Sequence, residues 1–272
     1  MNQNFTEKEE ALYSIMKKYT DRDVCIAFSG GADSSLLLKL AVDCAAEGTK
    51  IYAVTFDTVL HPSCDLDIAK KVAKEMGAIH QVIFINELDN SAIQHNQVDR
   101  CYQCKKMLFQ NLITFAGKVH AAAVLEGTNE DDLHVYRPGL RAVRELGVKS
   151  PLAEAGLTKK EVRSLAEKLG ISVANRPAAP CLATRLPYGA DLQPDILRKI
   201  EDGETYLKQA GFPVVRLRLH GNIARIEIPV SDFSAFIEKR QEITDRLKQT
   251  GFSYITLDME GFRSGSMDET LS

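Results

Sequence analysis

The stretch Val24-Cys25-Ile26-Ala27-Phe28-Ser29-Gly30-Gly31-Ala32-Asp33-Ser34-Ser35 decides the fold. Its first five residues form a short apolar run, which predicts a strand that is covered on both faces. The two glycines allow the backbone to turn sharply, and apolar residues then recur at helical spacing from Leu37 to Cys44. The stretch therefore predicts a buried strand, a tight turn and the start of a helix.

A helix that begins directly after a glycine turn offers a site for an anion. Its first N–H groups have no partner within the helix, and its dipole is positive at this end. Ser29, Ser34 and Ser35 add hydroxyl groups, and the carboxylate of Asp33 can hold Mg²⁺. The P-loop of kinases and GTPases would need a lysine after the glycines, and the dinucleotide-binding motif would need a third glycine. Both are missing here, so the pattern predicts a phosphate site of another class.

The sequence Ser-Gly-Gly-x-Asp-Ser at residues 29–34 resembles the pyrophosphate loop of the ATP pyrophosphatase superfamily. Enzymes of that superfamily split ATP into AMP and pyrophosphate and use the AMP to activate a carbonyl or carboxylate. The resemblance implies an ATP and Mg²⁺ site in which Asp33 also serves catalysis, built from Ser29, Gly30, Gly31, Asp33 and Ser34. An ordinary strand–turn–helix made of small residues is the alternative. The match of the loop in its expected context favours the ATP site.

Strands and helices alternate after this loop. A second strand is predicted over 50–56, a helix over 69–76, a third strand over 80–85 and a fourth strand over 121–125. This rhythm predicts an α/β fold with a parallel sheet whose faces are covered by helices.

The carboxyl ends of parallel strands line the ligand crevice of such a fold. Phe56 and Asp57 lie at the end of the second strand, and Thr128 lies in the polar turn after the fourth strand. These three residues are therefore candidates for binding the nucleotide. Polar residues at strand ends are also common without any function.

The segment 174–194 carries four prolines and shows little periodicity, so it predicts a loop and a domain junction. The rest of the chain predicts a smaller α+β unit: a helix over 195–210, strands over 214–220 and 224–230, a helix over 231–248 and a last strand over 254–259. We expect an ATP pyrophosphatase domain at 1–185 and a second domain for substrate binding or oligomerisation at 186–272.

The composition excludes several classes of protein. A chain of 272 residues with a net charge of −3 argues against a nucleic-acid partner, because such proteins usually carry a basic surplus. The first ten residues are polar and acidic, unlike a signal peptide. No apolar run approaches the ~20 residues that cross a bilayer. We therefore expect a cytoplasmic protein without a membrane partner, whose six cysteines serve as thiols, metal ligands or catalysts.

Three cysteines stand in positions that suggest chemistry. Cys101 and Cys104 form a C-x-x-C pair, and Cys181 follows a proline in the junction segment. A C-x-x-C pair brings two sulfurs to one metal ion or cluster. The alternatives are a redox disulfide without a thioredoxin-like context, a zinc site without a neighbouring histidine, an iron–sulfur cluster with one open iron, and inert buried thiols.

Six motifs occur in one order, and the ordered set resembles the LarE family, the ATP-dependent sulfur transferases of nickel-pincer nucleotide biosynthesis. The resemblance covers nearly the whole chain. The motifs are residues 29–34, Arg100-Cys101-Tyr102-Gln103-Cys104-Lys105, Tyr136-Arg137-Pro138-Gly139, Ser150-Pro151-Leu152, Pro180-Cys181-Leu182-Ala183-Thr184-Arg185 and Glu260-Gly261-Phe262-Arg263-Ser264-Gly265-Ser266.

The resemblance implies a reaction and its substrate. ATP adenylates a carboxylate of pyridinium-3,5-biscarboxylic acid mononucleotide, and a sulfur nucleophile then displaces AMP to give a thiocarboxylate. Arg216 and Arg218 match the phosphate-binding pair of the family, and they share one face of the strand over 214–220 with His220. The alternative for that face is a solvated surface. Arg185 is a candidate for binding a substrate carboxylate or phosphate, or for a salt bridge at the junction.

The resemblance also bears on the sulfur source. Family members with only the cysteine that matches Cys181 give up its sulfur, whereas members with three cysteines bind a [4Fe–4S] cluster and use sulfide or another sulfur donor. This chain has all three, so the resemblance favours Cys101, Cys104 and Cys181 as cluster ligands, with Cys181 also catalytic. It further implies a homo-oligomer. Transfer from Cys181 itself, tRNA thiolation and a non-catalytic iron–sulfur carrier remain alternatives.

Overall fold

The computed structural model describes residues 3–177, 180–263 and 265–267. Ala178 and Ala179 of the predicted junction and Ser264 of the last motif lie outside the described residues. The chain forms two compact units, one of Met1–Glu87 with Asp99–Ala179 and the other of Leu88–Val98 with Pro180–Ser272. The sequence placed a domain limit after residue 185. The segment Leu88–Val98, which lies far from residue 180 in the sequence, thus joins the second unit.

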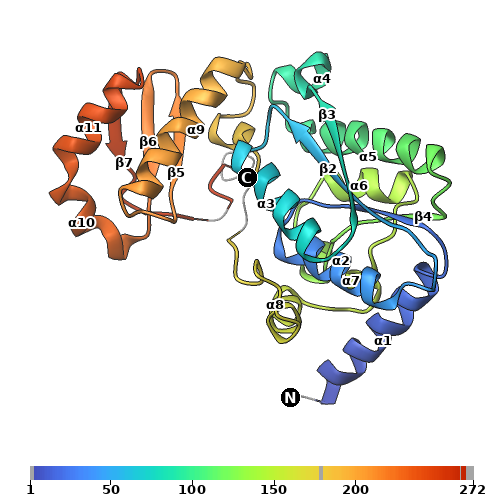
Figure 1. Ribbon diagram of the computed structural model, residues 1–272. Helices are drawn as coiled ribbons and strands as arrows, with labels where there is room; N and C mark the ends of the chain where they lie inside the picture. The colour runs from blue at the N-terminus through green and yellow to red at the C-terminus, as the bar shows by residue number, and fades with distance from the viewer. Residues whose placement is uncertain (1–2, 178–179, 264, 268–272) are drawn as a thin grey trace. The chain divides into compact units, whose positions relative to one another are not determined.

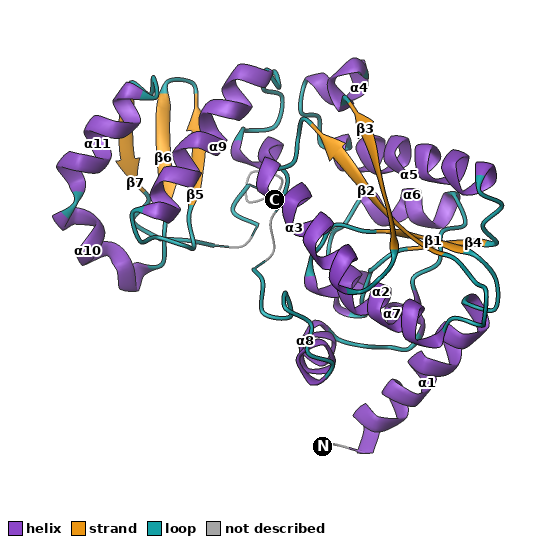
Figure 2. Ribbon diagram, in the orientation of Figure 1, coloured by secondary structure: helices purple, strands orange, loops and turns teal. Residues whose placement is uncertain are grey.

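The first unit is built on a four-stranded sheet with the order β3-β2-β1-β4, in which every pair of neighbours is parallel (Figures 1 and 2). The predicted α/β fold with a parallel sheet is confirmed. The strands are β1 (Val24–Ala27), β2 (Ile51–Thr58), β3 (Ile79–Ile85) and β4 (Ala123–Leu125).

Helices cover both faces of this sheet. Val24 and Ile26 of β1 pack in one core with Leu37 of α2, whereas Cys25 packs in a separate core with Leu112 of α5. This double burial explains why β1 is apolar at consecutive positions. The helices are α1 (Gln3–Tyr19), α2 (Ala32–Cys44), α3 (Ser63–Glu75), α5 (Arg100–Lys118), α6 (Gly139–Glu145), α7 (Pro151–Glu154) and α8 (Lys159–Lys168), with the 3₁₀ helix η2 (Asp131–His134).

The second unit is the smaller α+β part that the sequence predicted. In its sheet β5 (Arg216–His220) is antiparallel to β6 (Ile223–Glu227), and β7 (Tyr254–Leu257) is parallel to β6. The helix predicted over 231–248 is wrong in one respect, because the chain forms two helices there that meet at Lys239. The helices are α4 (Ser91–Gln94), α9 (Pro194–Gln209), α10 (Phe233–Glu238) and α11 (Arg240–Gln249). The 3₁₀ helices are η3 (Leu182–Arg185), η4 (Val230–Asp232) and η1 (Glu87–Asp89), within which the chain passes from the first unit to the second. No helix in the described part of the chain is long and apolar enough to span a membrane.

Candidate active site

The turn between β1 and α2 has the geometry of an anion site. Gly30 adopts a φ of +68°, and a Cβ at this position would lie 3.0 Å from the backbone nitrogen of Ala69 in α3. Gly31 is the N-cap residue of α2, and no described side chain caps that helix. The first N–H groups of α2 are therefore available to a phosphate, with the positive end of the helix dipole behind them.

Hydroxyl groups hold the turn in shape. Ser29 Oγ lies 3.1 Å from Ser34 Oγ, the N–H of Ser29 donates to Ser34 Oγ at 3.3 Å, and Ser34 Oγ donates to the carbonyl of Gly31 at 3.3 Å. Ser35 differs, because its side chain is fully buried and its Oγ has no hydrogen-bond partner among the described residues. Ser29 and Ser34 thus belong to the loop as predicted from the sequence, whereas Ser35 points into the core.

Asp33 in the first turn of α2 carries a cationic partner. Lys159, the first residue of α8, forms an ion pair with its Oδ2, and Nδ2 of Asn129 donates to its Oδ1 at 3.3 Å. Both charged side chains are partly exposed, at 24% for Asp33 and 34% for Lys159. An ammonium group at this carboxylate shows that the position favours a cation, which fits the predicted Mg²⁺ site.

Two further residues, Gly127 and Arg176, contact the backbone around the turn between β1 and α2. Gly127, after β4, packs so closely that a Cβ would lie 3.1 Å from the backbone nitrogen of Ser34. Arg176 donates to the carbonyl of Gly30 at 3.3 Å and forms an ion pair with Asp65 of α3. Sequence reasoning missed Lys159, Asn129 and Arg176 as residues of this site. Thr158 and Glu161 gave only the signal of a capping box, which the structure confirms as the start of α8.

The predicted crevice residues lie at the carboxyl ends of their strands. Phe56 and Asp57 are half-buried near the end of β2. Thr128 is buried, and its N–H donates to Oε1 of Glu126 at 3.0 Å. Burial raises the pKa of Glu126, but the charge of Lys105 and hydrogen bonds from neighbouring groups outweigh burial and lower the pKa overall. Glu126 thus remains ionised and ties the end of β4 to α5 through Lys105 at 3.2 Å.

The cysteines are placed in different parts of the two units. Cys101 is exposed and Cys104 half-buried in the first turns of α5, on one face of that helix because they are three residues apart. Nη2 of Arg100 donates to Sγ of Cys101 at 3.2 Å. Cys181 belongs to the second unit, directly before η3. Within each unit, the described residues hold no group of three or more His, Cys, Asp or Glu side chains that forms a metal site.

Arg185 organises the turn that carries Cys181. Its guanidinium binds both carboxylate oxygens of Glu204, at 2.8 and 2.9 Å, and the two side chains are 2% and 3% exposed. The same guanidinium donates to the carbonyl groups of Pro180 and Cys181 at 2.9 and 3.3 Å. The salt bridge weighed from the sequence is present. A contact between Arg185 and substrate stays a prediction.

The strand face predicted for Arg216, Arg218 and His220 is only partly solvated: Arg218 is buried, Arg216 is half-buried and His220 is exposed. Arg218 is 7% exposed and donates to Glu227 and to the carbonyl of Thr184, each at 2.6 Å. Arg216 lies with its guanidinium 5.3 Å from the ring centre of Phe262, and burial lowers its pKa.

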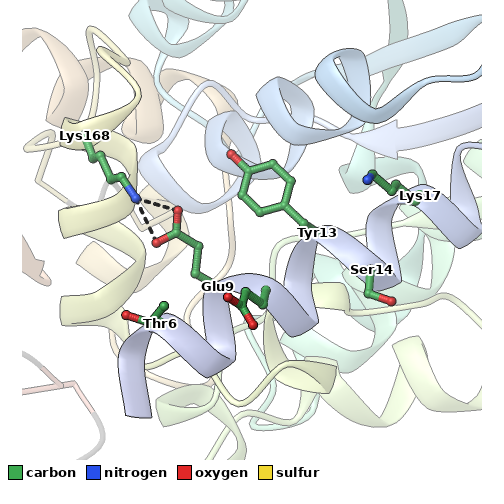
Figure 3. A pocket seen from close by; sticks show the side chains of 7 residues that line it. Thr6, Glu9, Tyr13, Ser14, Lys17 and Lys168 are labelled. Carbon is green, nitrogen blue, oxygen red and sulfur yellow. Dashed lines mark hydrogen bonds and ion pairs between the residues drawn. The ribbon is translucent and has the colours of Figure 1, made fainter. Parts of the chain in front are cut away.

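A pocket of about 460 Å³ lies elsewhere in the first unit, along α1 and the last turn of α8 (Figure 3). Its lining includes Glu9, Tyr13 and Lys168. Lys168 donates to both carboxylate oxygens of Glu9, at 2.7 and 3.0 Å, so these two charges of the lining are paired. Lys168 ends the ten-residue helix that begins with Lys159, so these two residues are about 13.5 Å apart along the axis of α8.

Comparisons with known proteins agree with this geometry. The family model described as asparagine synthase matches residues 9–109, which include the whole loop. A protein of Lactiplantibacillus plantarum, pyridinium-3,5-bisthiocarboxylic acid mononucleotide synthase, is 39% identical over 249 residues, covering 92% of this chain and 90% of the relative. The chain belongs to the LarE family. As a LarE-type protein it is an enzyme of the ATP pyrophosphatase group and a sulfur transferase.

More distant relatives share only part of the LarE chain. The tRNA-specific 2-thiouridylase MnmA of Rickettsia peacockii is 27% identical over 196 residues, covering 57% of this chain and 52% of the relative. The NH₃-dependent NAD⁺ synthetase of Aeropyrum pernix is 25% identical over 187 residues, covering 64% of each. The predicted resemblance to the LarE family is confirmed by a relative that matches along nearly the whole chain, the Lactiplantibacillus plantarum protein.

Proposed function

We propose that this enzyme uses ATP to transfer sulfur to pyridinium-3,5-biscarboxylic acid mononucleotide, forming its thiocarboxylates with release of AMP and pyrophosphate. The observation that carries the proposal is the uncapped start of α2 beside the Asp33–Lys159 pair, in a chain of the LarE family. The relative from Lactiplantibacillus plantarum is named for the bisthiocarboxylic product, which supports the same substrate here.

The proposed ATP site uses the residues of the loop. The N–H groups of α2 hold the leaving pyrophosphate, and Asp33 holds Mg²⁺, which would neutralise charge on the phosphates. With Mg²⁺ held at Asp33, the ammonium group of Lys159 would be available to the phosphate oxygens. Phe56, Asp57 and Thr128 line the adenosine end of the crevice. In-line geometry at the α-phosphorus depends on this positioning.

The substrate phosphate is assigned to Arg216 and Arg218. Arg216 is half-buried next to the buried Arg218 on one face of β5, and burial lowers its pKa. Guanidinium groups match the geometry of phosphate oxygens and bind them with charge-assisted hydrogen bonds. The two arginines thus support a phosphate site on this face of β5.

Cys101, Cys104 and Cys181 are proposed to hold a [4Fe–4S] cluster. Three thiolates leave one iron open, which would supply a site for sulfide. Two sulfurs on one face of α5 and an N–H donor from Arg100 to Sγ of Cys101 fit thiolate ligands, because such donors stabilise charge on sulfur. Transfer of the sulfur of Cys181 itself is the alternative route. We further propose that the protein is a cytoplasmic homo-oligomer.

The test is a reaction of protein purified without air with Mg²⁺, ATP, sulfide and the biscarboxylic mononucleotide. We expect AMP, pyrophosphate and a product heavier by the exchange of oxygen for sulfur, detected by mass spectrometry. Absence of substrate-dependent AMP would refute the proposed function. AMP formation with bulk tRNA in place of the mononucleotide would favour tRNA thiolation. Conversion of Cys181 to dehydroalanine in iron-free protein would favour the sacrificial route.

A further inference from the structure

His61 belongs to a group of polar side chains at the end of β2 that the proposed chemistry leaves unused. Its Nδ1 lies 2.7 Å from Oγ1 of Thr58, the last residue of β2, and 3.9 Å from Oε1 of Glu87. The side chain of Glu87 is fully buried, whereas that of His61 is 39% exposed. The side chain of His61 thus has one nitrogen held by Thr58 and is partly open to solvent, and it follows the carboxyl end of β2, on the sheet edge that carries the ATP loop.

Glu87 determines which nitrogen of His61 carries the proton. Its Oε2 accepts the N–H of Val59 at 3.1 Å, and burial raises the pKa of the carboxyl group. Its Oε1 lies 3.9 Å from Nδ1 of His61. When ionised, a carboxylate on this side favours a proton on Nδ1, which then donates to the hydroxyl oxygen of Thr58 at 2.7 Å. The neutral imidazole then has its proton on Nδ1 and a lone pair on Nε2.

Charged groups from two other elements flank His61. Burial lowers the pKa of His61; Asp65 of α3 opposes this shift and Arg100 of α5 adds to it, so that the pKa stays below its ordinary value. Asp65 is paired with Arg176, which donates to the carbonyl of Gly30 in the ATP loop. Arg100 donates to Sγ of Cys101. The two charges that act on the pKa of His61 are thus tied to the ATP loop and to Cys101.

We propose that Nε2 of His61 accepts the proton that sulfur transfer releases, an inference that rests on the proposed function. The nucleophile is hydrosulfide, and the acceptor is the carbonyl carbon of the acyl adenylate. A C–S bond forms, the C–O bond to AMP breaks with its electron pair leaving on AMP, and the S–H proton passes to Nε2. The thiocarboxylate leaves ionised. Adenylation involves a carboxylate without a proton, so His61 acts in the second half-reaction alone.

The test separates the two half-reactions in the full-length protein. Substrate-dependent exchange of labelled pyrophosphate into ATP reports adenylation, and thiocarboxylate formation with sulfide reports sulfur transfer. We expect His61→Gln to slow sulfur transfer by about 10²–10⁴-fold, the usual contribution of a general base, while exchange changes by less than about twofold. Imidazole added to His61→Gly should restore sulfur transfer. Thr58→Val, which removes the partner of Nδ1, should slow sulfur transfer about tenfold.

The pH dependence distinguishes proton transfer from a packing role. The titration of hydrosulfide in solution affects the wild-type protein and the His61→Gln variant equally. The measured quantity is therefore the ratio of their rates of sulfur transfer, wild type over His61→Gln. This ratio should rise from near one at low pH, where His61 is protonated, to a plateau reached below its ordinary pKa of 6.5. His80→Gln is the matched control, since Nε2 of His80 is held by Thr55 at 2.9 Å and burial also lowers its pKa.

Three results would overturn the inference, and they differ from failure of the proposed function. Equal losses of exchange and sulfur transfer in both His61→Gln and Thr58→Val would assign His61 a structural role. A ratio that does not change with pH, or no rescue by imidazole, would also exclude proton transfer. If instead wild-type protein shows no exchange dependent on the mononucleotide, the proposed function fails and this inference fails with it.

Discussion

Replacing Gly30 with alanine should destabilise the first unit by an amount that the structure allows us to work out. A residue with a Cβ costs roughly 1–2 kcal/mol in the left-handed region, where Gly30 has its φ of +68°. The new Cβ would also lie 3.0 Å from the backbone nitrogen and Cα of Ala69. Backbone cannot move aside as a side-chain end can, so overpacking adds about 1–3 kcal/mol. We therefore expect a total loss of about 2–5 kcal/mol.

Gly77 offers a matched control for this substitution. It has a φ of +71°, but a Cβ there would meet no described atom within 4 Å. Gly77→Ala should therefore cost only the backbone part, roughly 1–2 kcal/mol. Equilibrium unfolding in urea, followed by circular dichroism, measures both losses. The reasoning is refuted if Gly30→Ala costs no more than Gly77→Ala, because the contact with α3 would then contribute nothing to the need for glycine in the loop.

Three further predictions follow from charged groups. Lys159→Ala should lower kcat/KM for ATP by about 10–150-fold, which is the value of one charge-assisted contact. Lys160→Ala, a variant of the exposed neighbouring residue, should leave kcat/KM unchanged. Steady-state AMP release measures both values. Glu204→Gln should lower the free energy of unfolding by about 3 kcal/mol or more, because it leaves the buried charge of Arg185 without its partner. Asp195, on the same helix, has a side chain that is 95% exposed, so Asp195→Asn should leave the free energy of unfolding in urea unchanged. The pKa of Glu126 is lowered in the folded state. Ionised Glu126 therefore contributes to stability above the ordinary pKa of 4.5, and this contribution is lost as the pH falls through the lowered value. Glu126→Gln should flatten this part of the curve of stability against pH.

The features that could be predicted from the sequence are those that depend on residues close together along the chain. The apolar run of β1, the glycine turn and the capping box at Thr158 each act over a few residues, and the structure confirms all three. The parallel direction of the four strands also follows from the alternation of strands and helices, whereas their order was not predicted. The segment Leu88–Val98 is different, because nothing local shows that it joins residues that follow Pro180. Its Asn96 donates to carbonyl groups of Ala183, Leu186 and Pro187, and such contacts arise only once the chain has folded.

The same distinction applies to the site. Asp33 was predictable because its motif is contiguous, but its partners Lys159 and Asn129 lie 126 and 96 residues away. His61 gave no signal either, since a single histidine after a strand has no pattern until Glu87 is brought beside Thr58. Sequence motifs thus identify groups that bind the nucleotide backbone, whereas the groups that set charge and proton position are gathered by the parallel topology.

The pairing of Asp33 with Lys159 has a consequence for how ATP binding couples to the first unit. Asn129 and Lys159 belong to the loop after β4 and to α8, so the carboxylate of Asp33 joins three segments. In the proposed ATP complex, in which Asp33 would hold Mg²⁺, phosphate oxygens would be the partners of the same ammonium group. Because the pair is partly exposed, its contribution to stability is small, about 0–1 kcal/mol. Lys159→Ala should therefore impair ATP use far more than folding, which is the opposite of the pattern expected for Glu204→Gln.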